Sequence, residues 1–473
     1  MKKAIPWLSL ILGIIFSTII WNYISLPYDN TNTINGQYSL NKINPLNDTL
    51  RGLFFIFFPL FLYLITFIKF NKKLITKKIF QSKNAILNNN IDYLCVILII
   101  FSILEFYSLN YKNFLGAIDV HHEGTFLTAQ LNFFSKNQIW TGTFFDYGFL
   151  GNSIGIFFNS IFDGYSIGIQ RFLFKVLILL NKILIILICR QIIISISSTN
   201  KKEILFLIFS LSSITLASFY EHVTPFHSRV FIYLIATLLI FNIVTAKKNS
   251  FFKSFLTGFF SLLSILFYWD IGSYINVLLI VFLAYLFFTK NYGNFYSVIL
   301  GVLLSWIIFF ILTPSNEFKE FFNQYSIILN VSDYLIGIEF PKPFSDKSTR
   351  HTKALLLIIF SGVFLINYIF DKLKNESLES KFLLFFIFIS SILFLKSGLT
   401  RSDGPHIKYS SGQYTLLIFF FITYYLINFI NKFNFFSKIN YFFQKKNYFV
   451  FLSIIVCFLF IFQNNYFSFL NIF

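Results

Sequence analysis

The sequence predicts an all-α membrane protein of about 13 transmembrane helices, with amphipathic helices on its extracytoplasmic surface. Two observations predict this fold class. Hydrophobic residues make up 56% of the 473 residues, charged residues make up only 12%, and the mean hydropathy is +0.71, whereas a soluble domain needs a larger polar share. Apolar runs long enough to cross a bilayer also recur throughout the chain, and such runs cross as helices.

The first apolar run begins like a signal peptide, but it is too long and no small-x-small cleavage site follows, so we expect a span. The stretch 254–289 is long enough for two spans, which we divide near Trp269-Asp270-Ile271-Gly272. The other expected spans are residues 1–26 and then about 52–70, 93–109, 171–197, 204–219, 230–246, 295–313, 352–370, 382–397, 413–430 and 448–464.

The basic residues fall between the apolar runs, so the net charge of +18 does not indicate nucleic-acid binding. If the amino terminus is cytoplasmic, every loop on the inner side carries lysine, as the positive-inside rule requires. We therefore expect a multi-pass protein of the inner (plasma) membrane of a bacterial cell envelope. The inner loops would be residues 71–92, 198–203, 247–253, 290–294, 371–381 and 431–447.

This topology places all six histidines on the extracytoplasmic side, together with most acids that lie outside the spans. We expect these groups to form one shared site. The histidines are His121, His122, His222, His227, His351 and His406; the acids are Asp119, Glu123, Asp146, Glu221, Asp333, Asp346 and Asp403, with Asp270, Arg229, Arg350 and Arg401 at or near the outer ends of spans.

The long outer segment 110–168 contains the densest of these groups, in the sequence DVHHEG. In a helix, Asp119, His122 and Glu123 share one face. Two carboxylates beside an imidazole can take a proton from a hydroxyl, or can hold a divalent cation such as Mg²⁺ or Mn²⁺. The alternative is a polar patch that ends the preceding span. The following GTFLTAQLNFFSKNQIW has apolar residues at helical spacing and predicts a helix on the membrane surface.

Two shorter junctions bring further charges to the same side. YEHVTPFHSR contributes His222 and Arg229, whose guanidinium either binds a phosphate oxygen or snorkels from a helix end. YWDIGSY contributes Asp270, which either caps the next helix or binds a sugar hydroxyl or metal, while Gly272 permits a tight turn.

The loop 398–412, with the sequence GLTRSDGPHIKYSSG, is the most charged late segment. Arg401 and Lys408 can grip a phosphate, Asp403 can orient Arg401 or a sugar, and His406 lies between them. Gly404-Pro405 is expected to break any helix, and a solvated loop is the alternative. The sequence of the loop 314–351 predicts an amphipathic helix followed by a loop that could act as a gate. We expect this loop to contact the acceptor or lipid.

Residues 93–310 resemble a known family. A span, a D-x-x-x-E-G element, a surface helix and the sequence FFDYGFLGN, which contains Asp146, are similar to the first outer loop of C-type-fold (GT-C) membrane glycosyltransferases. The sequence RSDGPH resembles a late outer-loop motif of some relatives. Two features depart from the family pattern: two spans precede this loop, and His121-His122 has no counterpart. The expected organisation is residues 1–92 with two spans, a GT-C-like core 93–310, and carboxyl-terminal spans 311–473.

The resemblance implies a sugar donor linked to polyprenyl phosphate, and a first-loop acid, Asp119 in preference to Glu123, as catalytic base. We therefore expect an inverting glycosyltransferase whose acceptor is a lipid, glycan or protein. No Walker A, G-x-G-x-x-G or D-x-D sequence is present, which favours a lipid-linked donor over a nucleotide sugar. The alternatives are an O-antigen or polysaccharide polymerase or ligase, a transporter or lipid flippase, and a non-catalytic scaffold.

The expected topology can be tested by labelling single cysteines with a membrane-impermeant thiol reagent in intact cells. Reporters at positions 119–123 and 401–406 should react from outside, because both segments follow outward-running spans. Reporters within 71–92 should react only after permeabilisation. Labelling of the first two segments from opposite sides would contradict the shared site.

Overall fold

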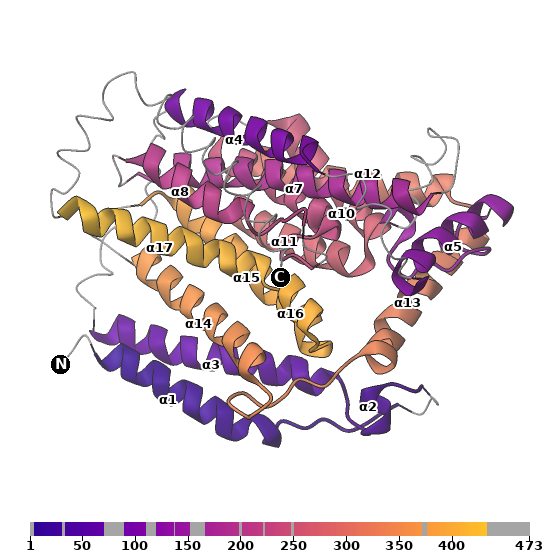
Figure 1. The fold of residues 1–473 in the computed structure, drawn as a ribbon, viewed down its shortest axis with the longest axis horizontal. Helices are drawn as coiled ribbons and strands as arrows, with labels where there is room; N and C mark the ends of the chain where they lie inside the picture. Colours follow the sequence, from indigo (N-terminus) through magenta and orange to yellow (C-terminus); the bar gives the residue numbers. More distant parts are fainter. Residues whose placement is uncertain are drawn as a thin grey trace, which may run out of the picture.

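The computed structural model describes residues 4–30, 34–70, 89–109, 120–136, 138–151, 166–197, 201–220, 223–246, 250–370 and 376–432, and this part of the chain is built from helices (Figure 1). Ten of its helices are long and apolar enough to cross a membrane, so the chain is an integral, multi-pass, all-α membrane protein. These are α1 (Ile5–Ile20, continued by a 3-10 turn), α3 (Leu46–Phe70), α4 (Asn89–Tyr107), α7 (Ile167–Ser195), α9 (Phe231–Thr245, preceded by the 3-10 turn η4, Ser228–Val230), α11 (Trp269–Phe288), α12 (Tyr292–Leu312), α14 (Thr349–Phe370), α15 (Leu378–Thr400) and α17 (Gly412–Lys432).

Two further apolar helices are shorter. Helix α10 (Phe251–Phe267) has 17 residues and α8 (Lys202–Ile214) has 13, so the expected span 204–219 is only partly helical. The division of 254–289 is confirmed, because α10 ends and α11 begins on either side of Tyr268. The expected span 448–464 lies outside the described residues, and the count of 13 therefore stays a prediction.

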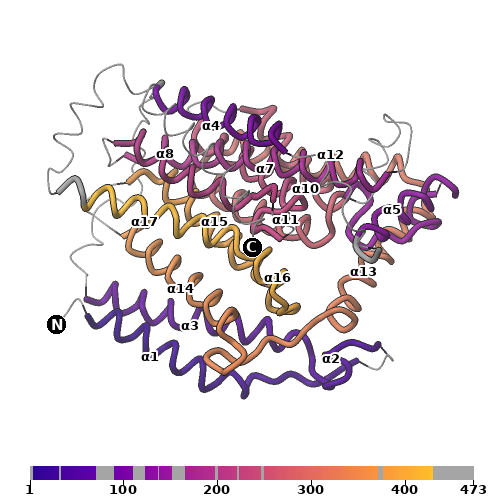
Figure 2. Tube along the Cα trace, in the orientation of Figure 1, coloured from indigo at the N-terminus to yellow at the C-terminus, as the bar shows by residue number. Residues whose placement is uncertain are grey.

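The remaining helices lie at one end of the bundle. Figures 1 and 2 show the long helices side by side, with α2 (Gln37–Leu40), α5 (Val120–Lys136), α13 (Ser315–Ile336) and α16 (Gly404–Tyr409) gathered at one end. Helix α13 runs across this end rather than along the bundle. We call the end of the bundle that carries α2, α5, α13 and α16 the α13 end. The helices expected after Glu123 and after residue 314 are thus present as α5 and α13, while their position on the outer membrane surface stays a prediction.

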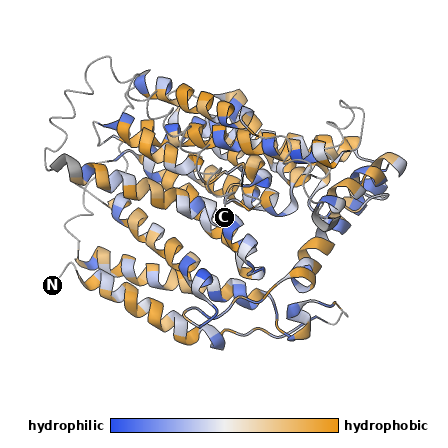
Figure 3. Ribbon diagram, viewed as in Figure 1, coloured by the Kyte–Doolittle hydropathy of each residue, from blue (hydrophilic) through white to orange (hydrophobic). Residues whose placement is uncertain are grey.

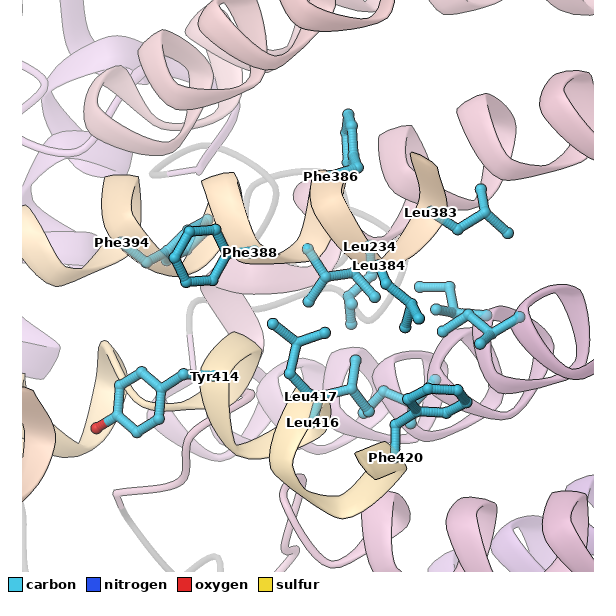
Figure 4. Close-up of a cluster of buried hydrophobic side chains, with 14 of the residues drawn as sticks. Leu234, Leu383, Leu384, Phe386, Phe388, Phe394, Tyr414, Leu416, Leu417 and Phe420 are labelled. Carbon is cyan, nitrogen blue, oxygen red and sulfur yellow. The ribbon is translucent and has the colours of Figure 1, made fainter. Parts of the chain in front are cut away.

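Helix α15 is the centre of the bundle. In its most apolar window 72% of the residues are buried, against 28% in α1, α3 and α12, so it contacts other helices on nearly all sides. Figure 4 shows its side chains packed against those of α9 and α17. The labelled residues are Leu234 on α9, Leu383, Leu384, Phe386, Phe388 and Phe394 on α15, and Tyr414, Leu416, Leu417 and Phe420 on α17.

The peripheral helices expose apolar side chains. Leu8 on α1, Phe61 on α3 and Ile307 on α12 are each more than half exposed, and the hydropathy colouring of Figure 3 shows apolar residues along the whole length of these helices. Exposed apolar surface on this scale is costly in water but is suited to lipid chains.

Helices α10 and α12 approach closely because each carries a glycine at the contact. A Cβ on Gly258 would lie 2.0 Å from the carbonyl oxygen of Val298, and one on Gly301 would lie 2.1 Å from that of Phe255. Close backbone approach through small residues is a common way to pack membrane helices, since lipid provides little hydrophobic drive.

Helices α4 and α7 are joined by two ion pairs. Lys182 Nζ lies 2.6 Å from Glu105 Oε2, with both side chains at most 5% exposed, and Arg190 Nε lies 2.6 Å from Asp92 Oδ1. The buried Lys182 side chain therefore does not extend to the membrane surface. A charge among membrane helices is stable only with a partner, and Glu105 supplies it.

The two pairs should differ in their effect on stability. Removing one partner of a buried pair costs about 3–5 kcal/mol, whereas an exposed pair contributes about 0–1 kcal/mol. We expect Glu105→Gln to lower the apparent melting temperature in detergent strongly, and Glu105→Gln with Lys182→Met to recover most of the loss. Asp92→Asn, whose carboxylate is 43% exposed, is the matched control and should change it little. Equal losses from the two single variants would contradict the assignment.

Candidate functional site

A polar cluster around Arg229 lies at the α13 end. The Nη2 atom of Arg229 is 2.9 Å from Asp270 Oδ1, and its guanidinium carbon lies 4.5 Å and 5.0 Å from the ring centroids of Tyr147 and Tyr268. The cation is thus held by one carboxylate and two aromatic faces, which lowers its desolvation cost.

Local backbone structure places Arg229. His227 caps η4, because its Nδ1 accepts a hydrogen bond from the Arg229 backbone N–H at 3.2 Å. The His227 carbonyl oxygen in turn accepts from the Asn181 side chain on α7 at 2.8 Å. Arg229 is therefore fixed by α7 as well as by α9, and does not simply snorkel from a helix end.

Asp270 does not cap α11. The capping position is Tyr268, which makes no side-chain capping hydrogen bond, and the Asp270 carboxylate instead pairs with Arg229. Gly272 does not form the turn either. It lies within α11, where a Cβ would be 2.5 Å from the Ile265 backbone, so the glycine permits close packing of α10 against α11.

The segment 138–151, which carries Tyr147, is bound to α13 by hydrogen bonds. The buried Glu317 carboxylate accepts hydrogen bonds from the backbone N–H groups of Trp140 at 2.6 Å and Thr141 at 3.0 Å. The Gln324 amide donates to the carbonyl oxygens of Trp140 and Thr143. Neither Glu317 nor Gln324 was predicted to have a role. Both lie on the buried face of the amphipathic helix α13, and polar residues on such a face could have been recognised in the sequence.

The same segment is fixed to the start of α11. The Trp269 backbone N–H donates to the Tyr147 carbonyl oxygen at 2.9 Å, and its indole N–H donates to that of Phe145 at 2.7 Å. Gly148 has a φ of +135°, where a Cβ would lie 2.7 Å from the Phe267 carbonyl oxygen. Tyr147 therefore points at Arg229 from a rigid loop, and Asp146, half-buried beside it, adds its charge to the field at Arg229.

The second part of the site is the segment 401–409. Asp403 caps α16: its Oδ1 accepts from the His406 backbone N–H at 2.9 Å and lies 2.7 Å from His406 Nδ1. Its Oδ2 accepts from Arg401 Nε at 3.2 Å. Gly404-Pro405 therefore begins a short helix instead of breaking one, since proline suits the first turn. Lys408 lies on the same helix.

The two parts meet through aromatic rings. The His227 ring contacts Tyr409 in a tilted arrangement at a centroid distance of 4.3 Å, and Tyr409 lies edge-on to His406 at 5.8 Å. Burial raises the pKa of Tyr147, while the charges of both Arg229 and Arg401 act to lower it. Arg229, Asp270, Arg401, Asp403 and His406 therefore lie in one cluster.

Burial and charge keep the imidazoles neutral. Burial lowers the pKa of His227 well below the ordinary histidine value, and the neighbouring Arg229 and His406 lower it further. Burial also lowers the pKa of His406, against the opposing effect of Asp403. Burial alone would raise the pKa of Asp403, but the hydrogen bonds from His406 lower it overall. Near pH 7 the site thus holds neutral imidazoles beside an ionised carboxylate.

Arg350 adds a further cation. A Cβ on Gly404 would lie 2.1 Å from Arg350 Nη1, so the exposed guanidinium rests against the first turn of α16. Within the described residues it makes no hydrogen bond or ion pair. The neighbouring His351 bonds through Nε2 to the Ser402 carbonyl oxygen at 2.6 Å, which fixes the backbone beside Arg401.

The amino-terminal helices reach this site through Asp48. Its fully buried carboxylate on α3 accepts from the Tyr38 hydroxyl at 2.9 Å, from the Phe340 backbone N–H at 2.9 Å and from Arg51 Nη1 at 3.2 Å. The segment that contains Phe340 pairs with Arg401 through a parallel bridge at Ile338. Asp48, another residue that the sequence analysis did not identify, thereby fixes the backbone on which Arg401 lies.

The first-loop acids are only partly described. Glu123 lies in the first turn of α5, where Arg171 holds both carboxylate oxygens, at 2.5 Å from Nε and 2.9 Å from Nη2. Three residues further on, Phe126 stacks on Tyr147 at 5.1 Å, so this end of α5 adjoins the cluster. Asp119 and His222 lie outside the described residues, and His122 is described in its backbone only.

The predicted divalent-cation site is therefore untested at two of its three ligands. At the third, Glu123, the paired guanidinium already neutralises the carboxylate, which makes it a poor metal ligand. In the described part of the chain no other group of three or more histidine, cysteine or acidic side chains is placed to hold a metal.

Comparison with known proteins adds no identification: no family model matches the chain, and no curated protein or solved structure is similar to it.

Asp48→Asn should destabilise the protein and displace Arg401. The buried carboxylate accepts three hydrogen bonds, and bonds to charged groups contribute about 1.5–3 kcal/mol each. We expect a clear fall of the apparent melting temperature in detergent. Asp346→Asn, the same change at an exposed carboxylate of the α13–α14 connection, is the control and should leave it unchanged. Equal effects would show that the three bonds do not stabilise the fold.

Proposed function

We propose that this chain is an inverting membrane glycosyltransferase that takes a sugar from a polyprenyl-phosphate donor at the α13 end, which faces the extracytoplasmic side. The acceptor would be a hydroxyl of a lipid, glycan or protein. The observation that carries the proposal is the convergence of Arg229, Arg401 and Arg350 with Asp403 and His406 where membrane helices end.

This arrangement suits a lipid-linked phosphate. The long apolar chain of such a donor stays among lipids, so its phosphate reaches a protein only near the end of the spans. Arg401 uses Nε to bind Asp403, and its terminal nitrogens make no hydrogen bond within the described residues. A guanidinium oriented in this way presents two parallel donors, which match two phosphate oxygens.

The remaining groups have complementary roles. Arg350 can reach the same phosphate because it lies against α16, and Arg229 contributes positive potential from η4. In the transfer, the acceptor oxygen bonds to the anomeric carbon, the bond from that carbon to the phosphate oxygen breaks, and polyprenyl phosphate leaves. The cations stabilise the negative charge that develops on the phosphate. Asp146 and Asp270, both partly exposed, can accept hydrogen bonds from sugar hydroxyls.

The ion pairs between α4 and α7 favour a second candidate, a transporter or lipid flippase. Ionisable groups at membrane depth often mark a transport pathway, and Lys182–Glu105 is such a pair. The two candidates make opposite predictions for Glu105→Gln with Lys182→Met: a transferase retains sugar transfer once the protein folds, whereas a transporter that uses this pair loses transport.

The proposed function can be tested by sugar transfer in membranes. Purified protein in liposomes should transfer radiolabel from one of a panel of polyprenyl-phosphate hexoses and pentoses to acceptors extracted from the envelope. Arg401→Gln should raise the KM for the donor about 10- to 100-fold, because it removes a charge-assisted contact to phosphate. Lys347→Gln, an exposed cation at the same end, is the matched control and should have no effect. Absence of transfer from every donor by the wild-type protein would reject the function.

A further inference from the structure

The pair Asp403–His406 has the geometry of a carboxylate–imidazole dyad. The Nδ1 atom of His406 lies 2.7 Å from Asp403 Oδ1, and the same oxygen accepts from the His406 backbone N–H. Both contacts fix the imidazole relative to the first turn of α16. The side chain is 25% exposed, so one edge of the ring remains accessible.

This contact determines the tautomer. Because a carboxylate accepts hydrogen bonds, the proton of the neutral ring resides on Nδ1, and Nε2 carries the lone pair. Nε2 makes no hydrogen bond to any residue that the structure describes. An imidazole whose Nδ1–H is held by a carboxylate and whose Nε2 is free is the arrangement that proton-abstracting histidines use.

The surrounding charges keep this imidazole unprotonated in the resting state. Arg401 lies on the same segment, Arg229 on η4, Arg350 against Gly404 and Lys408 on α16, with Asp403 the nearest opposing charge. His227 and Tyr409 also face the ring region and are neutral near pH 7. The excess of cations disfavours an imidazolium until a phosphate anion enters the site.

Glu123, the acid of residues 119–123 whose side chain the structure describes, is less suited to act as a base. Both oxygens of Glu123 are held by Arg171, so taking up a proton there would weaken two charge-assisted hydrogen bonds. His406, by contrast, adjoins the cations that would bind the donor phosphate, because Arg401 shares the carboxylate of Asp403 with it.

We propose that His406, oriented by Asp403, is the general base that deprotonates the acceptor hydroxyl, in place of the acids of residues 119–123. The inference rests on the proposed glycosyltransferase function and adds the residue that moves the proton.

In the step, the acceptor O–H proton transfers to His406 Nε2 as the acceptor oxygen bonds to the anomeric carbon. The bond between that carbon and the phosphate oxygen breaks, and the electron pair leaves with polyprenyl phosphate. The resulting imidazolium is stabilised by the Asp403 carboxylate at Nδ1, and it returns its proton to water or to the departing phosphate.

The test compares His406→Ala, Asp403→Asn and Asp119→Asn with wild type in the liposome assay. We expect His406→Ala to lower kcat about 10²- to 10⁴-fold with little change in the donor KM, and added imidazole to restore part of the rate. Asp403→Asn should also lower kcat, because an amide can hold the wrong tautomer. Asp119→Asn should retain most of the wild-type kcat.

The pH profile provides an independent readout. The wild-type rate should rise with pH and level off, since the base acts unprotonated, and the inflection should lie below the ordinary histidine value because burial lowers the pKa of His406. In His406→Ala this inflection should be absent, and with imidazole it should follow the pKa of the added base.

Two results would overturn the inference while leaving the proposed function in place: full kcat in His406→Ala, whatever the effect of Asp119→Asn, or a loss in His406→Ala seen only as a raised donor KM. Rescue by imidazole separates lost chemistry from failed folding, because a misfolded variant is not rescued. If the wild-type protein transfers no sugar from any donor, the proposed function is rejected, and the assignment of His406 as its general base is rejected too.

Discussion

A charged side chain among membrane helices requires a partner, and three ion pairs between the described helices meet this requirement. Lys182 has Glu105, Arg190 has Asp92, and Arg229 has Asp270 with two tyrosine rings. The two pairs between α4 and α7 also determine which faces of these helices meet, because an offset of one residue would leave four charges without partners.

The same requirement organises the α13 end. Glu317 and Gln324 satisfy the backbone of a loop that would otherwise bury unpaired N–H and C=O groups, and that loop carries Tyr147. Asp48 does the same for the segment beside Arg401. The backbone around the site is therefore held by buried polar side chains on α13 and α3.

Much of the fold could be predicted from the sequence, since long apolar runs and helical periodicity are local signals. Helix α5, helix α13 and the break at Tyr268 are examples. Pairings between distant residues could not be predicted: Lys182 and Glu105 are brought together by helix packing, which leaves no mark on either local sequence. Gly404-Pro405 was misinterpreted because proline both ends and begins helices, and the capping role of Asp403 decides between them. Asp119 and His222 remain predictions.

The junction at Asp48 has a consequence for any shortened form of the chain. Helices α1, α2 and α3 precede the rest of the bundle in the chain. The Asp48 carboxylate accepts hydrogen bonds from the Phe340 backbone N–H and from the Tyr38 hydroxyl. The Tyr38 hydroxyl also lies 3.2 Å from the carbonyl oxygens of Ile338 and Thr400. A chain that began at α4 would lose these partners from beneath Arg401. Such a chain would need another acceptor for the Phe340 backbone N–H and another donor for the carbonyl oxygens of Ile338 and Thr400.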